Sequence, residues 1–386
     1  ERSKGGEEGA VEAAMRVVRA HGEAIRAAFP GGVEAGPSGS TFAGNSTFGK
    51  AASSGDAAQP RLRFARVNLL KVGVDEIITD LENEGFMRLA TLQLVAAQPE
   101  QARKRNGPAA DGGREGEDSS SGTGKGTCFA LDTLLGDVIG FPRGTDLHAH
   151  PMVSDGRLLL QDRSSCLPAH ALAGKGIGNP TREDGEDARF QVVLDACSAP
   201  GNKAAHLAAV AVQRGGMVIA VERDAGRTAL MRTNLRRLGA SQVKVIEGDF
   251  LALDPLAEPQ SHASAILVDP SCSNSGTLEH PQAPGRARLQ RLSSFQEKAL
   301  SHALSFPHVE RVVYSTCSTH EEENEAVVAK VLKQFPGFRL ERTLPFWPSR
   351  GSGALAHASR CVRASPLDLS QGFFVASLVR RTPKVP

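Results

Sequence analysis

The second half of the chain alternates between two hydrophobic patterns. Short apolar runs that end in a polar residue are separated by longer stretches whose apolar residues recur at helical spacing. The first pattern predicts strands and the second predicts helices. Strands that alternate with helices are typical of a parallel sheet with helices on both faces, so we expect an α/β fold. The predicted strands are 190–196, 216–222, 242–250, 263–272 and 311–317, and the predicted helices are 202–213, 225–239 and 288–305. Gly239 is expected to close the second of these helices.

The first half of the chain has fewer regular patterns and more polar segments. Apolar residues at helical spacing predict an amphipathic helix over 7–29, within an N-terminal helical segment that we place at 1–30. Residues 31–60 are rich in glycine and serine, as expected of a flexible linker. The hydrophobic pattern then predicts a strand over Phe64–Leu70 and a helix over Val74–Asn83.

The rest of the first half is predicted to complete a small α+β module. Residues 96–127 are polar, charged and rich in glycine and serine, so we expect them to form a disordered insertion. Short strands and turns are expected over 128–169. We therefore divide the chain after the linker into an α+β module, 61–165, and an α/β domain, 166–386.

Length, composition and charge limit the domain organisation and the partners that the chain can have. A chain of 386 residues exceeds one ordinary hydrophobic core, which agrees with two domains. No apolar run reaches 18 residues, so no membrane span is expected. The formal net charge is only +2, so a polyanionic partner requires a local basic patch. Since the chain begins at Glu1 rather than with methionine, we expect it to be a fragment.

Six cysteines are spread along the chain without a CxxC pair. This spacing favours neither a zinc ribbon nor a disulfide framework. Free thiols are typical of a reducing compartment, the cytosol or the nucleus. His148 and His150 form an HxH pair with no cluster of cysteines or carboxylates nearby in the sequence, so we expect them to be structural and predict no metal site.

Acidic residues follow the first three strands of the predicted sheet, at Asp195, Glu222 and Asp249. In parallel sheets ligands bind at the carboxyl ends of the strands, where an acid after the second strand typically accepts hydrogen bonds from ribose. The turn 195–203, "DACSAPGNK", exposes backbone N–H groups but lacks the GxGxxG fingerprint. These residues favour a nucleoside ligand, with Asp249 at the adenine edge. The alternative is that each acid caps the helix that follows it.

Two thiols stand at the ends of the fourth and fifth predicted strands. Cys272 and Asp269 lie at the end of the fourth strand, and Cys317 lies at the end of the fifth. Because we expect these strands to be neighbours, both thiols and the carboxylate should face one cleft. The alternative for a single buried cysteine is inert packing. Two cysteines at adjacent strand ends favour a chemical role.

A thiol beside a nucleoside cofactor suggests attack on an electron-poor ring. C5 of cytosine is too weak a nucleophile to accept a methyl group, but a thiolate that adds to C6 converts the ring into an enamine. Such covalent catalysis divides one difficult step into easier ones. The start of a helix lowers a thiol pKa, and we expect a helix to begin at Ser318 or Thr319, with Ser318 and Glu321 at capping-box spacing.

With these residues in view, the sequence resembles a known enzyme family. The segments "DACSAPGNK", "VDPSCSNSG" and "YSTCSTHEEENE" are similar to the three core motifs of the Nop/Sun (Fmu-type) RNA cytosine-C5 methyltransferases. The segments "RVNLLK", "TDLHAHP", "LLLQDRSSCLPA" and "RASPLDLSQGFFVA" extend the resemblance over most of 61–379. The Asp-Pro-Ser-Cys form resembles the fifth-member subgroup, which implies large-subunit ribosomal RNA as the substrate and the nucleolus as the location.

The resemblance implies a Rossmann-like S-adenosylmethionine-dependent methyltransferase domain preceded by a small α+β RNA-binding domain. It implies that Cys317 is the nucleophile, that Cys272 assists product release and that Asp269 orients the cytosine. Lys203 would lie close to both the methyl donor and the base. Asn274 stands where the family has glycine, and asparagine is the residue that best tolerates a positive φ in its place. The residues implied around S-adenosyl-L-methionine are Cys197, Ser198, Ala199, Pro200, Gly201, Asn202, Lys203, Glu222, Arg227, Asp249 and Asp269.

Two basic clusters are candidates for contacts with RNA phosphates. Clusters of this kind neutralise phosphates, although a solvated helix face explains any single member equally well. The target base must leave its stack to reach a thiol in a cleft, which favours loops or unpaired RNA. The first cluster is Arg61, Arg63, Arg66 and Lys71, and the second is Arg286, Arg288, Arg291 and Lys298.

Other functions stay open at this point. A DNA cytosine-C5 enzyme carries Pro-Cys-Gln after the fourth strand, whereas Ser273 follows Cys272 here. A small-molecule methyltransferase has no need of two cysteines or an upstream RNA module. A catalytically idle rRNA-binding assembly factor is the remaining alternative, which the intact Cys317 disfavours. We expect a monomer.

Overall fold

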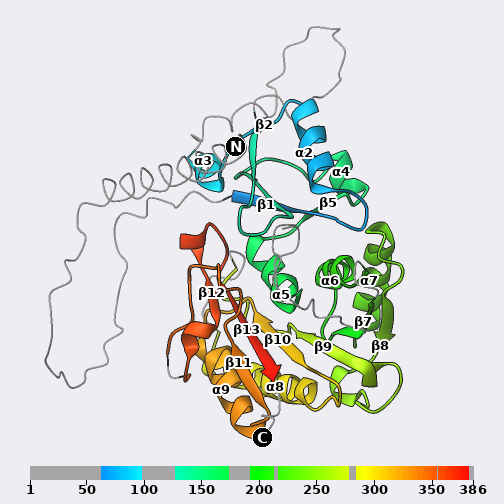
Figure 1. Cartoon of the computed structure of the whole chain (residues 1–386), viewed down its shortest axis with the longest axis vertical. Helices are drawn as coiled ribbons and strands as arrows, with labels where there is room; N and C mark the ends of the chain where they lie inside the picture. The colour runs from blue at the N-terminus through cyan, green and yellow to red at the C-terminus, as the bar shows by residue number, and fades with distance from the viewer. Residues whose placement is uncertain are drawn as a thin grey trace, which may run out of the picture. The chain divides into compact units, whose positions relative to one another are not determined.

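The computed structural model describes residues 62–97, 127–173, 192–212, 216–277, 284–353 and 355–381 (Figure 1). The predicted helix 7–29, the predicted linker and nearly all of the predicted insertion lie outside the described residues. All described residues belong to one compact unit, which contains two sheets. Every helix within the described ranges is too short or too polar to cross a bilayer.

The smaller sheet has five strands in the order β2-β3-β4-β1-β5. Neighbouring strands run antiparallel, except for the parallel pair β2 and β3. The predicted helix appears with the expected bounds, whereas β1 begins and ends earlier than predicted. The strands are β1 Leu62–Val67, β2 Met87–Arg88, β3 Cys128–Leu131, β4 Val138–Pro142 and β5 Leu158–Leu160, and the helices are α2 Val74–Asn83, α3 Leu92–Ala96 and α4 Pro151–Ser154.

Asn68 explains why β1 stops at Val67. Its Nδ2 donates to the carbonyls of Gly156 and Leu238, and its Oδ1 accepts from the Leu70 N–H, so the chain turns instead of extending. An asparagine side chain that bonds to nearby backbone competes with a strand ladder in this way. The alternating pattern continues past Asn68, and for that reason the predicted strand was too long.

The larger sheet has eight strands, and the five consecutive strands from β10 to the edge strand β8 are parallel as predicted. The path is β11-β13-β10-β9-β6-β7-β8, with β12 paired to β13. The strand β13 runs antiparallel to β10, so the sheet is mixed, and the three C-terminal strands were not predicted. The bounds are β6 Val192–Asp195, β7 Met217–Glu222, β8 Lys244–Glu247, β9 Ala263–Val268, β10 Arg311–Thr316, β11 Phe338–Glu341, β12 Val362–Ala364 and β13 Phe373–Arg380.

Helices cover both faces of this sheet, as the alternating pattern predicts (Figure 1). The helices α5, α6 and α7 share one apolar cluster, and α8 and α9 share another on the opposite face. The helix α7 ends before Gly239, whose φ of +72° favours glycine, as expected from the sequence. The bounds are α5 Arg163–Ala173, α6 Asn202–Val212, α7 Ala225–Arg237, α8 Arg286–Leu304 and α9 Glu325–Gln334, with 3-10 turns at η2 Phe250–Ala252, η3 Gln260–His262, η4 Glu321–Glu323, η5 Ala358–Arg360 and η6 Pro366–Asp368.

The helix α5 corrects the prediction of strands and turns over 128–169. It begins at Arg163 although Pro168 lies inside it. A proline in a helix interior normally signals a break, which is why the pattern favoured turns. Every residue of α5 except Ser165 is buried, so tertiary packing outweighs the cost of the proline. The helix spans the predicted boundary between 165 and 166.

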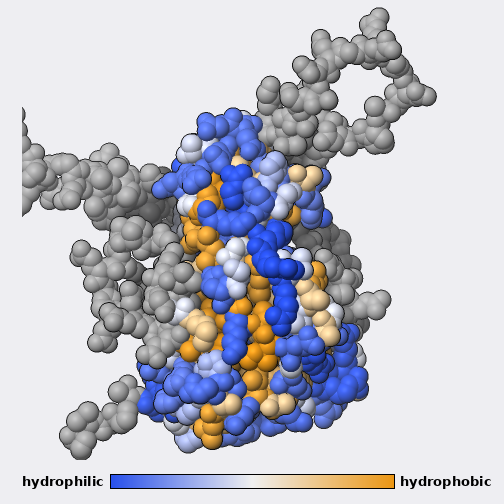
Figure 2. All heavy atoms as spheres, turned by 90° about the vertical axis from the view of Figure 1, so that its right-hand side faces the viewer, coloured by the Kyte–Doolittle hydropathy of each residue, from blue (hydrophilic) through white to orange (hydrophobic). Residues whose placement is uncertain are grey.

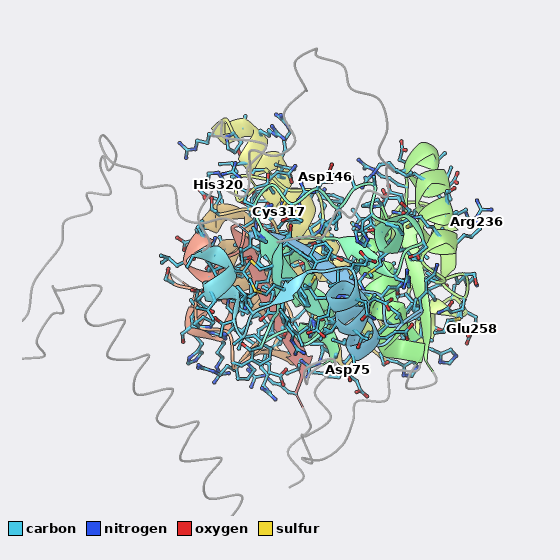
Figure 3. All side chains as sticks on the ribbon, turned by 90° about the horizontal axis from the view of Figure 1, so that it is seen from above. Asp75, Asp146, Arg236, Glu258, Cys317 and His320 are labelled. Atoms are coloured by element: carbon cyan, nitrogen blue, oxygen red, sulfur yellow. The ribbon has the colours of Figure 1, made fainter. Side chains whose placement is uncertain are left out.

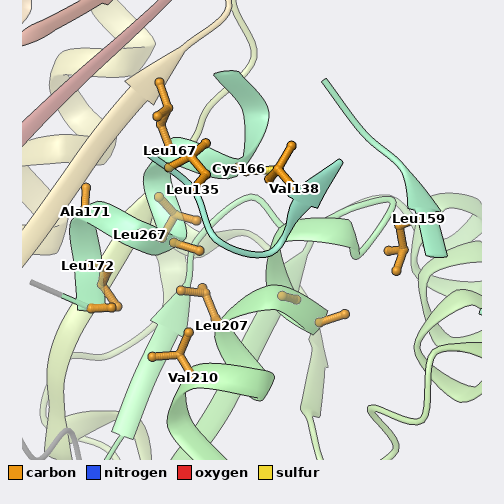
Figure 4. Packing of buried hydrophobic residues seen from close by; sticks show 14 of the residues in the cluster. Leu135, Val138, Leu159, Cys166, Leu167, Ala171, Leu172, Leu207, Val210 and Leu267 are labelled. Carbon is orange, nitrogen blue, oxygen red and sulfur yellow. The ribbon is translucent and has the colours of Figure 1, made fainter. Parts of the chain in front are cut away.

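One continuous apolar core joins the two sheets. It includes Phe64 and Val138 from the smaller sheet, Cys166 and Leu167 from α5, and Leu267 from β9. Figure 4 shows α5 side chains packed between the turn before β4 and the larger sheet. The smaller sheet is therefore held against the helical face of the larger one by apolar burial.

A buried polar cluster lies within this packing. Asp137, from the turn before β4, is fully buried between His170 of α5 and His206 of α6. Its Oδ1 lies 2.8 Å from His170 Nε2, and its Oδ2 lies 2.9 Å from His206 Nε2. Burial raises the pKa of Asp137, but the two histidines outweigh burial and hold this pKa well below its ordinary value. Burial and the nearby Arg66 lower the pKa of His206 from 6.5 to about 3.

The low pKa of His206 predicts that acid destabilises the fold. Below pH 6.5 the unfolded chain binds a proton that the buried imidazole does not, so the free energy of unfolding falls as pH falls. We expect a loss of about 2 kcal/mol between pH ~7 and ~5 from this one group. Urea unfolding at each pH measures this loss. His206→Gln should flatten the slope, and the exposed His148→Gln should not; equal slopes in the two variants would refute the assignment.

Candidate active site

A cavity of about 920 Å³ opens at the carboxyl ends of the parallel strands. Residues after β6, β7, β9 and β10 line it, and so do residues from α6 and α8. Cys272, Cys317 and Asp269 all face this cavity, which confirms the prediction that two thiols and a carboxylate share one cleft. The parallel pairing of β9 with β10 brings the two cysteines together.

The two thiols are in contact. The Sγ atoms of Cys272 and Cys317 lie 3.2 Å apart, and Cys317 is the more exposed of the two. The hydrogen bond from Cys272 lowers the pKa of Cys317, and Lys203 lowers it further, against the opposing effects of burial and Asp269. The same hydrogen bond and burial raise the pKa of Cys272. Cys317 is therefore the thiol that ionises first, with Cys272 as its hydrogen-bond donor.

Lys203 and Asp269 form an ion pair beside the thiols. Lys203 Nζ lies 2.8 Å from Asp269 Oδ2, and both side chains are about one-fifth exposed. Ser315 Oγ donates to the other oxygen, Oδ1, at 2.6 Å. Burial alone lowers the pKa of Lys203, but Asp269 outweighs burial and raises the pKa overall. The ammonium group is thus held charged within the cavity, where it can donate to a polar group on a ligand.

A buried glutamate ties the two cysteine loops together. Glu323 is fully buried, and its carboxylate accepts four hydrogen bonds. Oε1 accepts from the Ser273 N–H and from Gln296 Nε2, each at 3.0 Å, and Oε2 accepts from the hydroxyls of Ser273 and Ser318, each at 2.5 Å. Ser273 adjoins Cys272 and Ser318 adjoins Cys317, so Glu323 fixes the spacing between the two sulfur atoms.

The helix after Cys317 begins later than predicted. The segment after the strand forms the 3-10 turn η4, and α9 begins only at Glu325. The Ser318 hydroxyl donates to Glu323 and accepts from the His320 N–H, so the predicted capping box with Glu321 does not form. The helix α9 therefore does not begin directly after the Cys317 thiol. The contact with Cys272 and the charge of Lys203 lower its pKa instead.

The loop after Cys272 passes close to the rest of the site. Asn274 has a φ of +59°, in the left-handed region that asparagine tolerates better than most residues. Its Oδ1 lies 3.0 Å from Cys317 Sγ and 3.4 Å from Cys272 Sγ. Gly276 donates to the Cys317 carbonyl, and a Cβ added at Gly276 would lie 2.1 Å from the Gly372 carbonyl oxygen. Only glycine permits so close an approach of two backbones.

Most of the residues implied around the cofactor line this cavity. Cys197, Ala199, Pro200, Asn202, Lys203, Glu222, Arg227, Asp249 and Asp269 line it. The Ser198 side chain is buried instead, where its hydroxyl donates to the Asp195 carbonyl and accepts from the Val221 N–H. Gly201 precedes α6 with a φ of +100°. Nine of the eleven implied residues therefore share one surface, and Ser198 supports it from behind.

The three acids at the ends of the first three parallel strands have different surroundings, and two of them, Glu222 and Asp249, line the cavity. The Glu222 carboxylate is buried, accepts from the Asp224 N–H and pairs with Arg227 at 3.3 Å. Asp249 is exposed and caps η2 through the Leu251 N–H. Burial and the nearby Asp269 raise the pKa of Asp195 to about 7. Asp249 thus caps the 3-10 turn that follows it, as in the alternative interpretation of these acids, and its side chain also lines the cavity.

Sequence reasoning missed several residues of the cavity wall. They come from α5 and the segment before it, from η2 and α8, and from the approach to β13. The Leu-Gln-Asp-Arg-x-Ser-Cys block was noted only as part of the resemblance, and it is the signal that pointed to the first group. The residues are Gln161, Asp162, Ser164, Ser165, Phe250, Pro270, Phe295, Gln371 and Phe373.

The basic candidates differ in exposure: Arg61 lies outside the described residues, Arg63 is half-buried and Lys71 is exposed. Arg286, Arg288, Arg291 and Lys298 are exposed on α8, whereas Arg66 is fully buried. Arg66 donates to Gln161 Oε1 and to the Asn202 carbonyl, which corrects its assignment to a phosphate-binding cluster. It links the smaller sheet to the start of α6. His150 is also buried, caps α4 and contacts Glu84, as expected of a structural residue.

Comparisons with known proteins agree with this geometry. The family model described as "16S rRNA methyltransferase RsmB/F" matches residues 185–379. A mouse protein named "28S rRNA (cytosine-C(5))-methyltransferase" is 40% identical over 82% of this chain and 62% of its own length. The Arabidopsis thaliana "25S rRNA (cytosine-C(5))-methyltransferase NSUN5" is 42% identical over 64% of this chain and 44% of its own length. The chain thus spans less than two thirds of each of these relatives.

Solved structures share the fold. The "Methyltransferase Homolog Protein from Pyrococcus Horikoshii" matches with a TM-score of 0.60 at 22% identity, over 83% of this chain and 87% of its own. The structure of "NSun6 from Pyrococcus horikoshii with SFG" matches with a TM-score of 0.56 at 21% identity, over 83% of this chain and 91% of its own. These matches support the Rossmann-like methyltransferase fold expected from the sequence.

Proposed function

The chain belongs to the RsmB/F family of rRNA methyltransferases, and we propose that it methylates C5 of a cytosine in RNA with S-adenosylmethionine as the donor. The observation that carries the proposal is the pair of thiols at 3.2 Å, next to an ion pair of Lys203 and Asp269, in one cavity. The substrate proposed is large-subunit ribosomal RNA, because the relatives named above modify 25S or 28S rRNA. The predicted fifth-member subgroup is consistent with this substrate.

The cavity fits S-adenosylmethionine by size and by chemistry. At about 920 Å³ it is large enough for a nucleoside cofactor and a flipped base. Glu222 would accept hydrogen bonds from ribose, and Asp249 would lie at the adenine edge. Residues of the 197–203 turn and Arg227 would complete the pocket. S-adenosylmethionine supplies an electrophilic methyl group when bound.

Cys317 would start the reaction. Its thiolate forms a bond to C6 of the cytosine, and the C5–C6 π electrons move so that C5 becomes nucleophilic. C5 would then accept the methyl group that a bound donor supplies, and the former bonding pair of that methyl group would stay with the donor. A base removes the C5 proton, the C5–C6 double bond re-forms and Cys317 leaves as a thiolate. Each bond that forms is balanced by one that breaks.

Three other residues would support these steps. Asp269 and Lys203 would orient the base and stabilise charge on the ring, since both line the cavity as an ion pair. Cys272, which keeps its proton, would assist the release of the product at Cys317. The smaller sheet would serve as an RNA-binding module. The cysteines of the described residues are free thiols, which is consistent with the nucleus, and we propose that the chain acts as a monomer at the nucleolus.

Methyl transfer tests the proposal directly. Incubation of the chain with labelled S-adenosylmethionine and large-subunit rRNA should place label in 5-methylcytidine after nuclease digestion. The same assay with DNA and with a mixture of small metabolites serves as the control. An idle assembly factor would bind the RNA without transferring label, and label in DNA or in another nucleoside would contradict the proposal.

A further inference from the structure

We propose that the exposed face of α7 is a second RNA-binding surface, which holds the phosphate backbone of the substrate outside the cavity. The proposal rests on the proposed function and extends it. We define the α7 basic surface as the cationic residues Arg223, Arg227, Arg232, Arg236, Arg237, Lys244 and Lys71. Neither candidate basic cluster predicted from the sequence included the residues of α7 or β8.

The charge of this surface stands out against that of the whole chain. Between Arg223 and Ile246 there are six arginines and lysines and one acid, Asp224, which gives the segment a net charge of +5. The whole chain of 386 residues carries only +2. Asp224 itself caps α7 through the Arg227 N–H, so its carboxylate lies at one end of the helix. The positive charge is therefore local, as binding of a polyanion requires in a nearly neutral chain.

The helix presents these charges outward. Its buried stripe is Thr228, Met231 and Leu235, which pack on the sheet, whereas Arg232 and Arg236 are exposed on the opposite side. Arg232 and Arg236 are four residues apart and share one face, an arrangement of like charges that disfavours an isolated helix. Figure 3 shows Arg236 pointing into solvent, away from the part of the molecule that holds Cys317.

The outer arginines lack acidic partners within the described part of the chain. Arg232 donates to the Val245 carbonyl, Arg236 to the Thr233 hydroxyl, and Arg237 to the Val153 carbonyl and Asn234 Oδ1. All these acceptors are neutral. The positive charge of these three arginines is therefore not balanced by an acid. It is available to RNA phosphates, and the release of counterions from the RNA then favours binding.

The surface is continuous with the cavity. Arg223 and Arg227 at the start of α7 line the cavity wall. At the other end of α7, Lys71 from the smaller sheet packs against Gly239. An RNA strand whose target base enters the cavity could thus continue along α7 towards the predicted RNA-binding module. The face in Figure 2 shows strongly hydrophilic side chains in a column on the side where α7 lies in Figure 1.

RNA fits this surface better than an acidic protein does. Leu230 is the one large apolar side chain exposed on α7 among those described, so the helix offers little apolar area to a protein partner. Arginines that contact phosphates position a nucleic acid without reading its sequence. We therefore assign the surface to backbone contacts rather than to recognition of bases.

Binding of a fluorescein-labelled large-subunit rRNA fragment across a salt series tests the assignment. The variant Arg232→Gln/Arg236→Gln/Lys244→Gln leaves every cavity residue intact. We expect its affinity to fall about tenfold to hundredfold at ~100 mM KCl, and the slope of log K against log salt to become shallower by about 2. Unchanged binding of S-adenosylmethionine and an unchanged melting temperature would show that the variant is folded.

The matched control removes the same charge elsewhere. Lys333→Gln/Arg339→Gln/Arg342→Gln alters three exposed cations at the end of α9 and around β11, and should leave affinity and slope within about twofold. Equal losses in both variants, wild-type binding by the α7 variant, or displacement of the RNA by polyglutamate at equal charge concentration would each overturn the proposal. Methyl transfer by the wild type is scored separately, so a failure of the proposed function remains distinguishable from a failure of this surface.

Discussion

Cys272→Ala is expected to accumulate a covalent adduct between the protein and its RNA substrate, whereas Cys317→Ala should abolish methyl transfer. Cys317 has the lowered pKa and the greater exposure, so its removal takes away the group that forms the bond to C6. Loss of a nucleophile typically lowers kcat by at least about 10³-fold. Cys272 touches the sulfur that must leave, at 3.2 Å, so its removal should stall release rather than addition.

Denaturing gel electrophoresis with labelled RNA measures the adduct, and transfer of label from S-adenosylmethionine measures turnover. The control is the double variant Cys272→Ala/Cys317→Ala, which should form no adduct because the bonding sulfur is absent. If the double variant still forms an adduct, or if Cys317→Ala retains full activity, the assigned roles are wrong. Adduct in Cys317→Ala alone would exchange the roles of the two cysteines.

The pattern of the sequence was sufficient for the parts of the fold that depend on local signals. The five parallel strands appear where apolar runs end in polar residues, and α7 ends at the glycine that the sequence marked. The positive φ of Asn274 agrees with the tolerance of asparagine for this conformation, which was noted where it replaces a glycine of the family. These features follow from side-chain periodicity and backbone sterics, which act over a few residues.

Features that depend on distant partners were not predictable. The strands β10 and β13 are separated by the 56 residues between Thr316 and Phe373. The local sequence of β13 does not indicate that it pairs with β10 or that it runs antiparallel to it. Asp137, His170 and His206 lie on three separate segments and meet only through packing. Pro168 gave a misleading local signal because burial of α5 outweighs its cost.

In the cavity, too, some features follow from the local sequence and others depend on distant contacts. The strand ends brought Cys272, Cys317 and Asp269 together as expected, since parallel neighbours share an edge. The acidic run after Cys317 was interpreted as the start of a helix, because three glutamates in a row are typical of one. Its third glutamate instead turns inward to partners fifty residues away in the sequence. A local pattern gives no information about such a contact.

Glu323→Ala should therefore cost both stability and activity. Four donors lose their acceptor, and two of them, the Ser273 N–H and the Ser318 hydroxyl, are buried beside the cysteines. Removing one side of a buried charged network costs about 3–5 kcal/mol in the free energy of unfolding, which urea denaturation measures.

The neighbouring Glu322 is exposed and supplies the matched control, because Glu322→Ala removes the same side chain without breaking the network. The free energy of unfolding of Glu323→Gln should lie between those of Glu323→Ala and Glu322→Ala, because the amide fills the same space but accepts fewer hydrogen bonds. If Glu323 acts only on stability, methyl transfer by folded Glu323→Gln should match the wild type. A fall in its kcat at unchanged affinity for S-adenosylmethionine would instead show that this carboxylate sets the spacing of the two thiols. Wild-type stability in Glu323→Ala would contradict the role of the network altogether.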